Sequence, residues 1–353
     1  DPVRRPGYAW STVRSPVGGV ADKARTVALV ADVLRHSPKE LLRRPDTTTA
    51  ARLARAGFSE AMVEEFWRPL FAGIQLDPGL EVSSRRFDIV LRMLATGTVG
   101  VPERGIGAVS EQLAEGLPVR LRTPVESVAG TTVVLQSGER VTGRAVVVAT
   151  DGPTAHRLLG SAVPDPGSRP VACCWFSAPA APVAGPLLVL DGERSGPAMN
   201  VAVMSEVWPG YAPPGRALIA AAVPGPAALD PAVTGRVREQ LSRWWGAMTT
   251  DWQELRTDVI PHGQPLQAPP LRLKRRVGLG DGVFVCGDHR GTASAQGAMF
   301  SGGRAASAVV SWLAGGAGHQ PTESGAPGDA GHQPTEPGTP LNGPTTHDVT
   351  QPP

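Results

Sequence analysis

Residues 283–313 decide the fold expected for this chain, and they read VFVCGDHRGTASAQGAMFSGGRAASAVVSWL. The apolar run 283–286 predicts a short buried strand, which ends at a Gly-Asp pair. A loop of small residues follows, and residues 297–299 lead into a helix whose apolar positions recur as far as Leu313. The stretch is therefore a strand, a glycine-bearing turn and a helix in succession.

The junction between this strand and this helix suits an anionic or electron-rich ligand. The first N–H groups of a helix lack intrahelical acceptors, and the positive end of the helix dipole lies there too. Asp288, at the carboxyl end of the strand, is placed to accept hydrogen bonds from ribose-like hydroxyls. The alternative is a plain strand-end turn in which Asp288 contacts no ligand.

Composition and charge narrow the functional classes. Hydrophobic residues make up 41% of the 353, enough for a core in one large domain or two interleaved ones. Lys and Arg number 34 against 32 Asp and Glu, so a role in binding nucleic acid receives no support. No apolar run approaches the ~18 residues of a transmembrane helix, which leaves only peripheral membrane contact open. The oligomeric state is not indicated.

The three cysteines, Cys173, Cys174 and Cys286, form no CxxC pair. They predict neither a disulfide framework nor a zinc site, and we expect no metal. Free cysteines fit a reducing compartment, so we expect the protein in the cytoplasm. No Ser/His/Asp or Cys/His arrangement marks a nucleophilic centre, so no catalytic residue is assigned.

The first half of the chain changes from helices to strands. Residues 26–72 predict a run of short helices, and residues 83–93 continue it. Strand-like pieces begin at residues 119–122, and a hairpin turns at Ser137-Gly138. The run AVVVA at 145–149 predicts a strand that is buried on both faces.

The second half predicts an antiparallel sheet. Between residues 171 and 265, strand-like runs alternate with Pro/Gly turns and with one long helix at 232–248, a pattern typical of an α+β unit. Residues 315–353 repeat AGHQPTE and contain almost no large apolar side chains, so they predict a disordered tail.

The order of these motifs resembles the FAD-dependent amine oxidase, phytoene desaturase and protoporphyrinogen oxidase-like flavoproteins. The resemblance runs over roughly residues 98–313, through PVESV at 124–128, AVVVATDGPTAHRLL from 145, and the closing VFVCGDHRGTASAQGAMFSGGRAA. The closing motif is its most specific part. The resemblance implies FAD as cofactor and an α/β plus α+β fold, in which a three-layer Rossmann-like domain is interleaved with an antiparallel-sheet and helical substrate domain.

The resemblance also implies domain bounds and binding residues. The segments are the helical part of the substrate domain at 1–97, an FAD segment at 98–155, the substrate sheet at 156–265, the closing FAD segment at 266–314 and the tail at 315–353. The implied FAD contacts are the adenine and nucleotide side (Val125 and Thr150), the ribityl and pyrophosphate region (Gly287 and Asp288) and the isoalloxazine ring (Gly297, Ala298 and Met299). Small residues let the backbone approach a flat ring, and the helix dipole favours negative charge on the reduced flavin.

The chain departs from this family in one respect. It contains no strand followed by a GxGxxG turn, the element that binds the FAD pyrophosphate. Without that first βαβ unit, a central strand of the sheet would be missing and edges would be left unpaired. We therefore expect either a fragment of a longer flavoprotein or a protein that has lost FAD binding.

Four residues near the closing motif have two interpretations each. His289 is either a proton carrier or a loop histidine, and Cys286 is either a covalent flavin link or a buried strand residue. Lys274 either holds a water that helps to re-oxidise the flavin or lies on a solvated basic strand. Arg304 lies either near a phosphate or on the helix surface. In each case we favour the second interpretation.

The first functional hypothesis is an FAD-dependent oxidoreductase of the amine oxidase or desaturase type. It would transfer hydride to flavin from a C–N or C–C unit of a small apolar or amphipathic substrate. The second hypothesis is a truncated non-catalytic remnant that binds an apolar ligand or a partner chain. A structural protein that presents the repeated tail is a weaker third.

Overall fold

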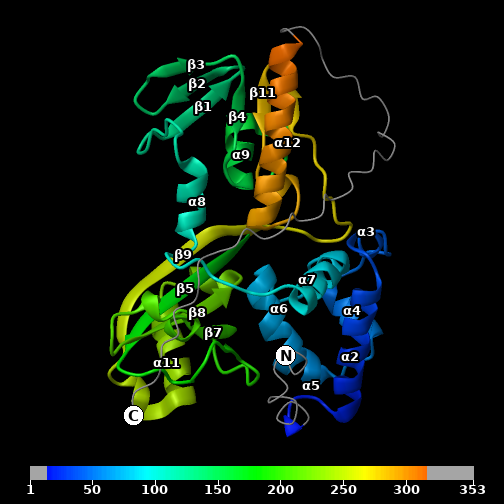
Figure 1. Cartoon of the computed structure of the whole chain (residues 1–353), viewed down its shortest axis with the longest axis vertical. Coiled ribbons are helices and arrows are strands. Elements are labelled where there is room, and N and C mark those ends of the chain that lie inside the picture. Colours follow the sequence, from blue (N-terminus) through cyan, green and yellow to red (C-terminus); the bar gives the residue numbers. More distant parts are fainter. Residues whose placement is uncertain (1–13, 316–353) are drawn as a thin grey trace, which may run out of the picture. The chain divides into compact units, whose positions relative to one another are not determined.

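The computed structural model describes residues 14–315, and it begins with a run of helices (Figure 1). This helical run comprises α2 (Val20–Arg35), α3 (Pro38–Leu41), α4 (Thr49–Arg55), α5 (Glu60–Met62), the π-helix Val63–Trp67, α6 (Arg68–Gln75) and α7 (Ser84–Thr96). Side chains accept a backbone N–H at four of the starts: Ser37, Thr48, Ser59 and Ser83. The predicted helices are confirmed, although the first begins at Val20 rather than near residue 26.

An aromatic cluster holds the helical run together. Trp67, Phe71 and Phe87 are almost fully buried, and the Phe71 and Phe87 ring centroids lie 4.4 Å apart. Each buried side chain of this size stabilises the fold by about 2–3 kcal/mol relative to exposure. The cluster therefore fixes α7 against α6.

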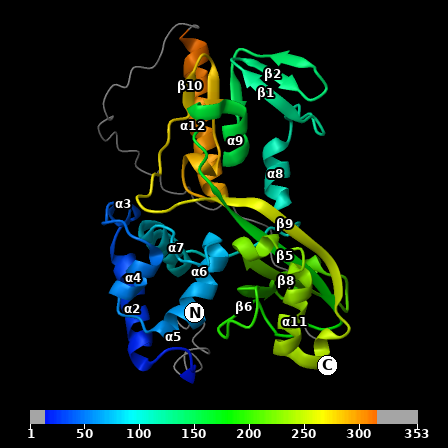
Figure 2. The same ribbon diagram turned by 180° about the vertical axis from the view of Figure 1, so that it is seen from behind.

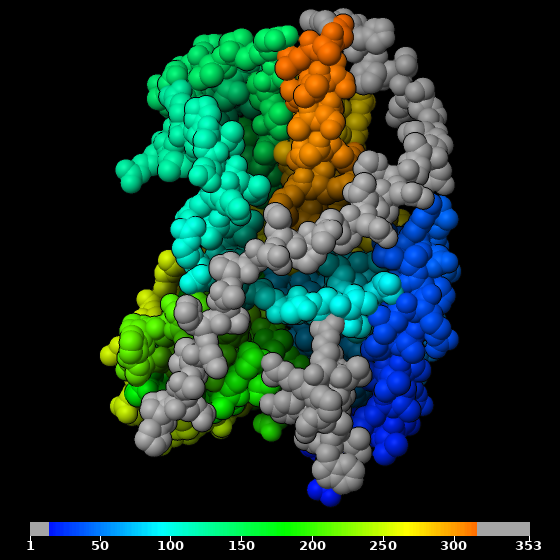
Figure 3. Space-filling model, in the orientation of Figure 1, coloured from blue at the N-terminus to red at the C-terminus, as the bar shows by residue number. Residues whose placement is uncertain are grey.

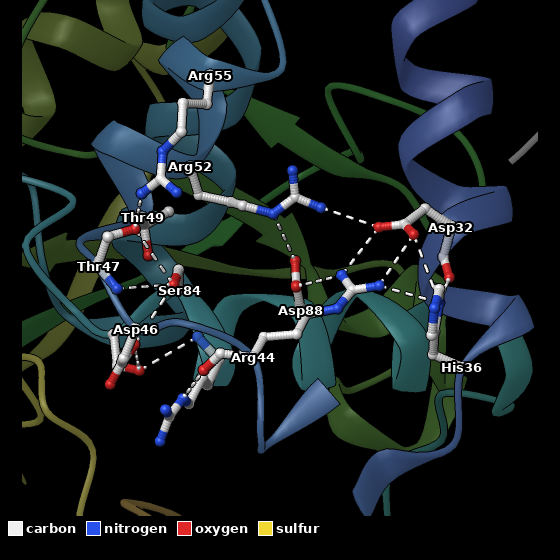
Figure 4. A network of polar contacts seen from close by, with 12 residues as sticks. Asp32, His36, Arg44, Asp46, Thr47, Thr49, Arg52, Arg55, Ser84 and Asp88 are labelled. Atoms are coloured by element: carbon white, nitrogen blue, oxygen red, sulfur yellow. Dashed lines mark hydrogen bonds and ion pairs between the residues drawn. The ribbon is translucent and has the colours of Figure 1, made fainter. Parts of the chain in front are cut away.

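Two arginines and two aspartates form a network of ion pairs that connects the same helices (Figure 4). Arg44 donates to Asp32 and to Asp88 at 2.9 Å, and Arg52 donates to the same two carboxylates at 3.0 and 3.3 Å. Burial raises the pKa of the Asp88 carboxyl, and the two guanidinium groups offset only part of that rise. Because cations and anions are equal in number, the network leaves no net charge at the base of α7.

The next group is a three-stranded hairpin sheet. It follows α8 (Gly107–Ala114) and comprises β1 (Val125–Ala129), β2 (Thr132–Leu135) and β3 (Arg140–Thr142) in the order β1-β2-β3. The turn at Gly138 has φ +85°, which glycine adopts without strain. The predicted strand at 119–122 is wrong, because this segment pairs with no strand and Leu121 is exposed.

The strand of the closing motif lies in a second, mixed sheet. β4 (Val146–Val148) pairs in parallel with β11 (Val283–Val285), which pairs antiparallel with β10 (Gly278–Gly280). α9 (Gly152–Leu159) follows β4. The prediction that residues 145–149 are buried on both faces is wrong, because the Val147 side chain is 42% exposed and points away from buried Val148.

The third sheet has five antiparallel strands in the order β6-β7-β8-β5-β9. Figure 2 shows β5, β8 and β9 of this sheet beside α11. Its strands are β5 (Ser168–Ala178), β6 (Leu188–Leu190), β7 (Asn200–Val203), β8 (Ala217–Pro224) and β9 (Gln253–Pro265), with α10 (Met204–Val207) and α11 (Val233–Trp245) between them. Alternate residues of β5 and β8 pack against α11 in one core. Cys174 lies in this core, and Cys173 points to the other face of the sheet. The predicted antiparallel sheet with one long helix is confirmed.

The final helix, α12 (Ala295–Ala314), packs through small residues. Its buried positions are Gly297, Ser301 and Ala305, spaced four residues apart. Much of α12 lies at the surface in Figure 3. Met299, at 50% exposed, and the exposed Val310 are apolar positions of this helix that lie outside its buried stripe.

The domain bounds given above stay a prediction. The predicted disordered tail lies outside the described residues, apart from Gly315, which caps α12. Among the described helices, none is both long and apolar enough to span a membrane.

Candidate cofactor-binding site

The carboxyl ends of β4 and β11 meet at one edge of the mixed sheet. Val285 lies opposite Val148, and the Cys286 N–H donates to the Val148 carbonyl at 3.0 Å. Because the two strands are parallel, the residues that follow them adjoin. A Cβ added to Gly287 would lie 3.0 Å from the Thr150 carbonyl oxygen. Gly287 has φ +144°, so the turn requires glycine.

Ser301 of α12 fixes this turn. Its Oγ accepts the Gly287 N–H at 2.9 Å and lies 2.7 Å from the Gly287 carbonyl oxygen. The side chain is completely buried, so both groups of Gly287 are bound in a water-free place. Ser301 was not predicted as a site residue, although it stands inside the quoted motif.

The start of α12 is shaped by a second glycine. The Ser294 Oγ accepts the Gly297 N–H at 3.0 Å, and a Cβ on Gly297 would lie 2.0 Å from the Thr292 carbonyl oxygen. Ala295 and Gln296 are exposed, and their N–H groups have no acceptor among the described residues. These donors and the helix dipole leave this end of α12 available to an electron-rich group.

Asp288 and His289 form the turn between the strand and the helix, within the short 3-10 helix Asp288–Arg290. Burial raises the pKa of the Asp288 carboxyl, and the His289 backbone N–H and the Arg86 guanidinium partly offset this. Burial and the neighbouring Arg290 and Arg275 lower the pKa of His289 to about 4. His289 is only 3% exposed, so it is a buried neutral imidazole rather than a solvated loop side chain.

Arg86 reaches this turn from α7 of the helical run. It is 7% exposed, and it donates to the Gln267 Oε1 at 2.6 Å and to the Ala293 carbonyl at 2.7 Å. The Gln267 side chain in turn donates to the Gly291 carbonyl at 3.0 Å. Burial lowers the pKa of Arg86 to about 10, which leaves it charged at neutral pH. The sequence carries no local signal for this contact, because about 200 residues separate the partners.

Val125 and Thr150 lie at another part of the site. Both line a cavity of about 340 Å³ together with Val146–Val148 and Leu158. β1 and β4 are each the last strand of their sheets, so one edge of each has no strand partner among the described residues. The cavity between them is lined mainly by apolar side chains.

The structure thus places the predicted residues in two neighbouring groups. Gly287, Asp288 and Gly297 adjoin the start of α12, and Val125 shares the apolar cavity with Thr150. Thr150 connects the groups, because its carbonyl lies beside Gly287. Ala298 is half-buried and Met299 is exposed at the start of the same helix.

The structure also shows the surroundings of Cys286, Lys274 and Arg304, which had two interpretations each. Cys286 is buried beside β4, and burial raises the pKa of its thiol. Lys274 is exposed. Arg304 is half-buried rather than at the helix surface, and its Nη2 donates to the Arg275 carbonyl at 2.8 Å. Within residues 14–315, no three metal-ligating side chains gather.

Comparisons with known proteins agree with this geometry. The model of the family described as flavin containing amine oxidoreductase matches residues 24–310. No curated protein sequence shows a significant match. A putative protoporphyrinogen oxidase from Exiguobacterium sp. 255-15 is similar in structure, with a TM-score of 0.61 and 17% identity over 84% of this chain and 74% of that chain.

Two further solved structures share the fold. An oxidoreductase from Methanosarcina mazei has a TM-score of 0.60 and 14% identity over 84% of this chain and 73% of its own. A putrescine oxidase bound to putrescine has a TM-score of 0.58 and 13% identity over 84% of this chain and 77% of its own. At these identities the likeness concerns the fold.

The chain belongs to the flavin-containing amine oxidoreductase family, because the family model covers most of its length. Its fold is the mixed α/β fold of these FAD proteins. It is therefore an FAD-dependent oxidoreductase by family, and FAD is the cofactor that the family implies.

Proposed function

We propose that this protein removes hydride from a C–N or C–C unit of a small apolar or amphipathic substrate and passes it to FAD. The observation that carries the proposal is the junction of Gly287 with Thr150 and Ser301, where two parallel strands end at the start of a helix. FAD, when bound, supplies the hydride acceptor. The protein supplies the orientation of the substrate and a place that excludes water.

The residues around this junction suit different parts of FAD. Val125 and Thr150 line the apolar cavity, which suits the adenine side. Gly287 and Asp288 suit the ribityl chain, because a backbone without a Cβ allows close approach and the carboxylate accepts hydroxyl hydrogen bonds. Gly297, Ala298 and Met299 suit the isoalloxazine ring at the positive end of α12. Each assignment compares the chemical character and the location of these residues with one part of FAD.

The surface at the start of α12 supports an apolar or amphipathic substrate. Met299 and Phe300 are both at least half exposed there. Exposed large apolar side chains at the end of a helix favour contact with an apolar partner. A putrescine oxidase with the same fold is bound to putrescine, an observation about that protein that supports amines as the first substrates to try.

A second candidate function is the binding of an apolar ligand or a partner chain without catalysis. The cavity between β1 and β4 supports it, because valine side chains line the cavity and the facing strand edges are open. An open strand edge can also accept an added strand. In this alternative the Gly287 turn would be a structural remnant.

Absorbance spectroscopy tests the proposal. The purified protein is incubated with FAD, separated from free FAD and scanned for bound flavin. We expect flavin to stay bound. We expect its absorbance to fall under anaerobic conditions when an amine, or an apolar substrate that can be desaturated, is added. The absence of flavin absorbance after FAD is supplied would overturn the proposal. In that case, binding of an apolar dye that Val147→Arg abolishes would support the second candidate.

A further inference from the structure

A basic cavity lies beside the Asp288–Arg290 turn. Its volume is about 460 Å³, and it is lined by the two segments 164–166 and 265–272, and by Arg275, His289 and Arg290. None of the seven residues assigned to FAD lines it. The feature therefore needs an explanation of its own.

The charges that face this cavity do not balance. Arg272, Arg275 and Arg290 contribute three guanidinium groups, and Asp165 contributes one carboxylate. His289 is neutral at pH 7, so three positive charges minus one negative charge leave two. In the described part of the chain, no carboxylate forms an ion pair with any of these arginines. Like charges held this close repel each other unless an anion joins them.

Buried donors in the same place lack acceptors. Arg290 is 5% exposed, and its Nε is buried without a hydrogen-bond partner among the described residues. Both ring nitrogens of His289, one donor and one acceptor in the neutral imidazole, are also buried without a partner among the described residues. So is the Nη1 of Arg304, which lies outside the cavity lining. Buried polar groups are almost always hydrogen-bonded, so an orphaned set of this kind points to a missing partner. A partner that accepts hydrogen bonds and carries negative charge meets both needs.

The electrostatics of the cluster support the same conclusion. Burial and Arg272 lower the pKa of Arg275, and burial, Arg275 and Arg304 lower the pKa of Arg290. Each cation is thus held where its charge is disfavoured. The Arg290 Nη2 also donates to the Arg276 carbonyl, and the Arg304 Nη2 donates to the Arg275 carbonyl at 2.8 Å. Backbone carbonyls satisfy part of each guanidinium but bring no negative charge.

We propose that this cavity binds the phosphate group of a small phosphomonoester. A phosphomonoester carries about −1.5 to −2 at neutral pH, which matches the uncompensated charge of the lining. Planar guanidinium forks bind phosphate oxygens through paired hydrogen bonds. The cavity lies within the size range of small-molecule sites, so an organic body fits beside the phosphate. The inference rests on the arginines alone and does not depend on the proposed oxidoreductase reaction.

The test is isothermal titration of the full chain in chloride buffer with saturating FAD. Excess FAD fills any pyrophosphate site, so binding that remains belongs elsewhere. The probes are inorganic phosphate, phenyl phosphate and benzoate, and both phosphates are expected to bind more tightly than the monoanionic benzoate. Arg275→Gln should weaken phosphate binding roughly 10- to 100-fold, the effect of one charge-assisted hydrogen bond.

The chain offers a matched control. Lys274→Gln removes the same charge from the neighbouring position, but Lys274 is exposed and does not line the cavity. It should leave phosphate binding within about twofold, since solvent screens an exposed charge that does not reach the bound anion. The Arg275 side chain makes no hydrogen bond among the described residues, so its replacement breaks none. The substitution also removes a repulsion between like charges. Arg275→Gln in chloride buffer should therefore have an unfolding temperature equal to or above that of the wild type. That measurement excludes misfolding as the cause of lost binding.

Three results would overturn the proposal. The first is no heat of binding for either phosphate probe. The second is equal weakening by Arg275→Gln and Lys274→Gln, which would assign the binding to the general field of the protein. The third is phosphate binding that FAD abolishes and Arg275→Gln leaves unchanged, which would place the anion in the FAD site.

Discussion

The Arg86 guanidinium donates a hydrogen bond to the Ala293 carbonyl at 2.7 Å, although 207 positions in the sequence separate the two residues. Arg86 lies on α7 of the helical run, and Ala293 lies in the turn before α12. The same guanidinium donates to Gln267 and Gln264 at 2.6 and 3.2 Å. One buried cation therefore connects the helical run and the segment after β9 to the closing motif.

Replacing Arg86 by methionine should lower the free energy of unfolding by about 2–4 kcal/mol. The substitution keeps most of the volume but leaves the Ala293 carbonyl and the Gln267 side chain buried without donors. Urea denaturation measures the change. Arg35→Met is the control, because Arg35 is exposed and makes no hydrogen bond among the described residues. Equal stability of the two variants would contradict a connecting role for Arg86.

Replacing Ser301 by alanine should loosen the Gly287 turn. The change removes the hydroxyl that accepts the Gly287 N–H in a fully buried place, at a cost of about 1–3 kcal/mol. If the proposed function holds, the variant should also retain less FAD on gel filtration than the wild type. Ser307→Ala on the same helix is the control, since Ser307 is exposed and bonds only the Gly303 carbonyl one turn earlier. A Ser301 variant as stable as the Ser307 variant would refute the argument.

Two glycines of α12 should respond in opposite directions to alanine. Gly297→Ala places a Cβ 2.0 Å from the Thr292 carbonyl, so overpacking should destabilise the protein by about 2–3 kcal/mol. Gly303→Ala meets nothing within 4 Å and should stabilise the helix by about 0.5–1 kcal/mol. Thermal and urea unfolding of the pair measure both effects. Stabilisation by both substitutions would show that the start of α12 has room for a side chain at position 297.

His289 should make the protein less stable as the pH falls. Its pKa is about 4 in the folded state and about 6.5 in the unfolded chain, so the unfolded chain binds the proton first. Above pH 6.5 both states are neutral and the full stability is present. Between pH 6.5 and 4 the free energy of unfolding should drop by at most about 1.4 kcal/mol per pH unit. His289→Leu should remove this component of the slope.

The control for His289 is His262, an exposed histidine that contacts the Ser168 hydroxyl. His262→Leu measures how much the loss of an exposed imidazole by itself changes the slope between pH 6.5 and 4. Unfolding is followed by urea at each pH in phosphate-free buffer, so that no anion in the basic cavity contributes. Parallel stability curves for wild type and His289→Leu would show that the pKa of His289 is the same in the folded and unfolded protein, and would contradict the prediction.

Local sequence patterns determined most of the secondary structure, including the turn and the helix start at the candidate site. Apolar spacing predicted the helical run and the five-stranded sheet, since burial of one face imposes a period on the sequence. Glycines marked the Gly287 turn and the Gly297 helix start, because only glycine tolerates that φ or that contact. The same patterns failed at Val147. There an apolar side chain is exposed, and spacing alone does not reveal which neighbours cover a face.

Only the tertiary structure decided which distant groups meet. By itself the sequence determined a strand, a glycine turn and a helix in residues 283–313, because backbone geometry depends on neighbours in the chain. It gave no sign that Arg86 would bond Ala293, or that Arg275 and Arg290 would share a cavity. Long-range contacts of this kind depend on how separate elements pack, and an arginine looks the same in sequence whether it is solvated or buried. The backbone conformation of the closing motif thus depends on neighbours in the sequence. The buried charged groups around it are brought there by the packing of distant elements.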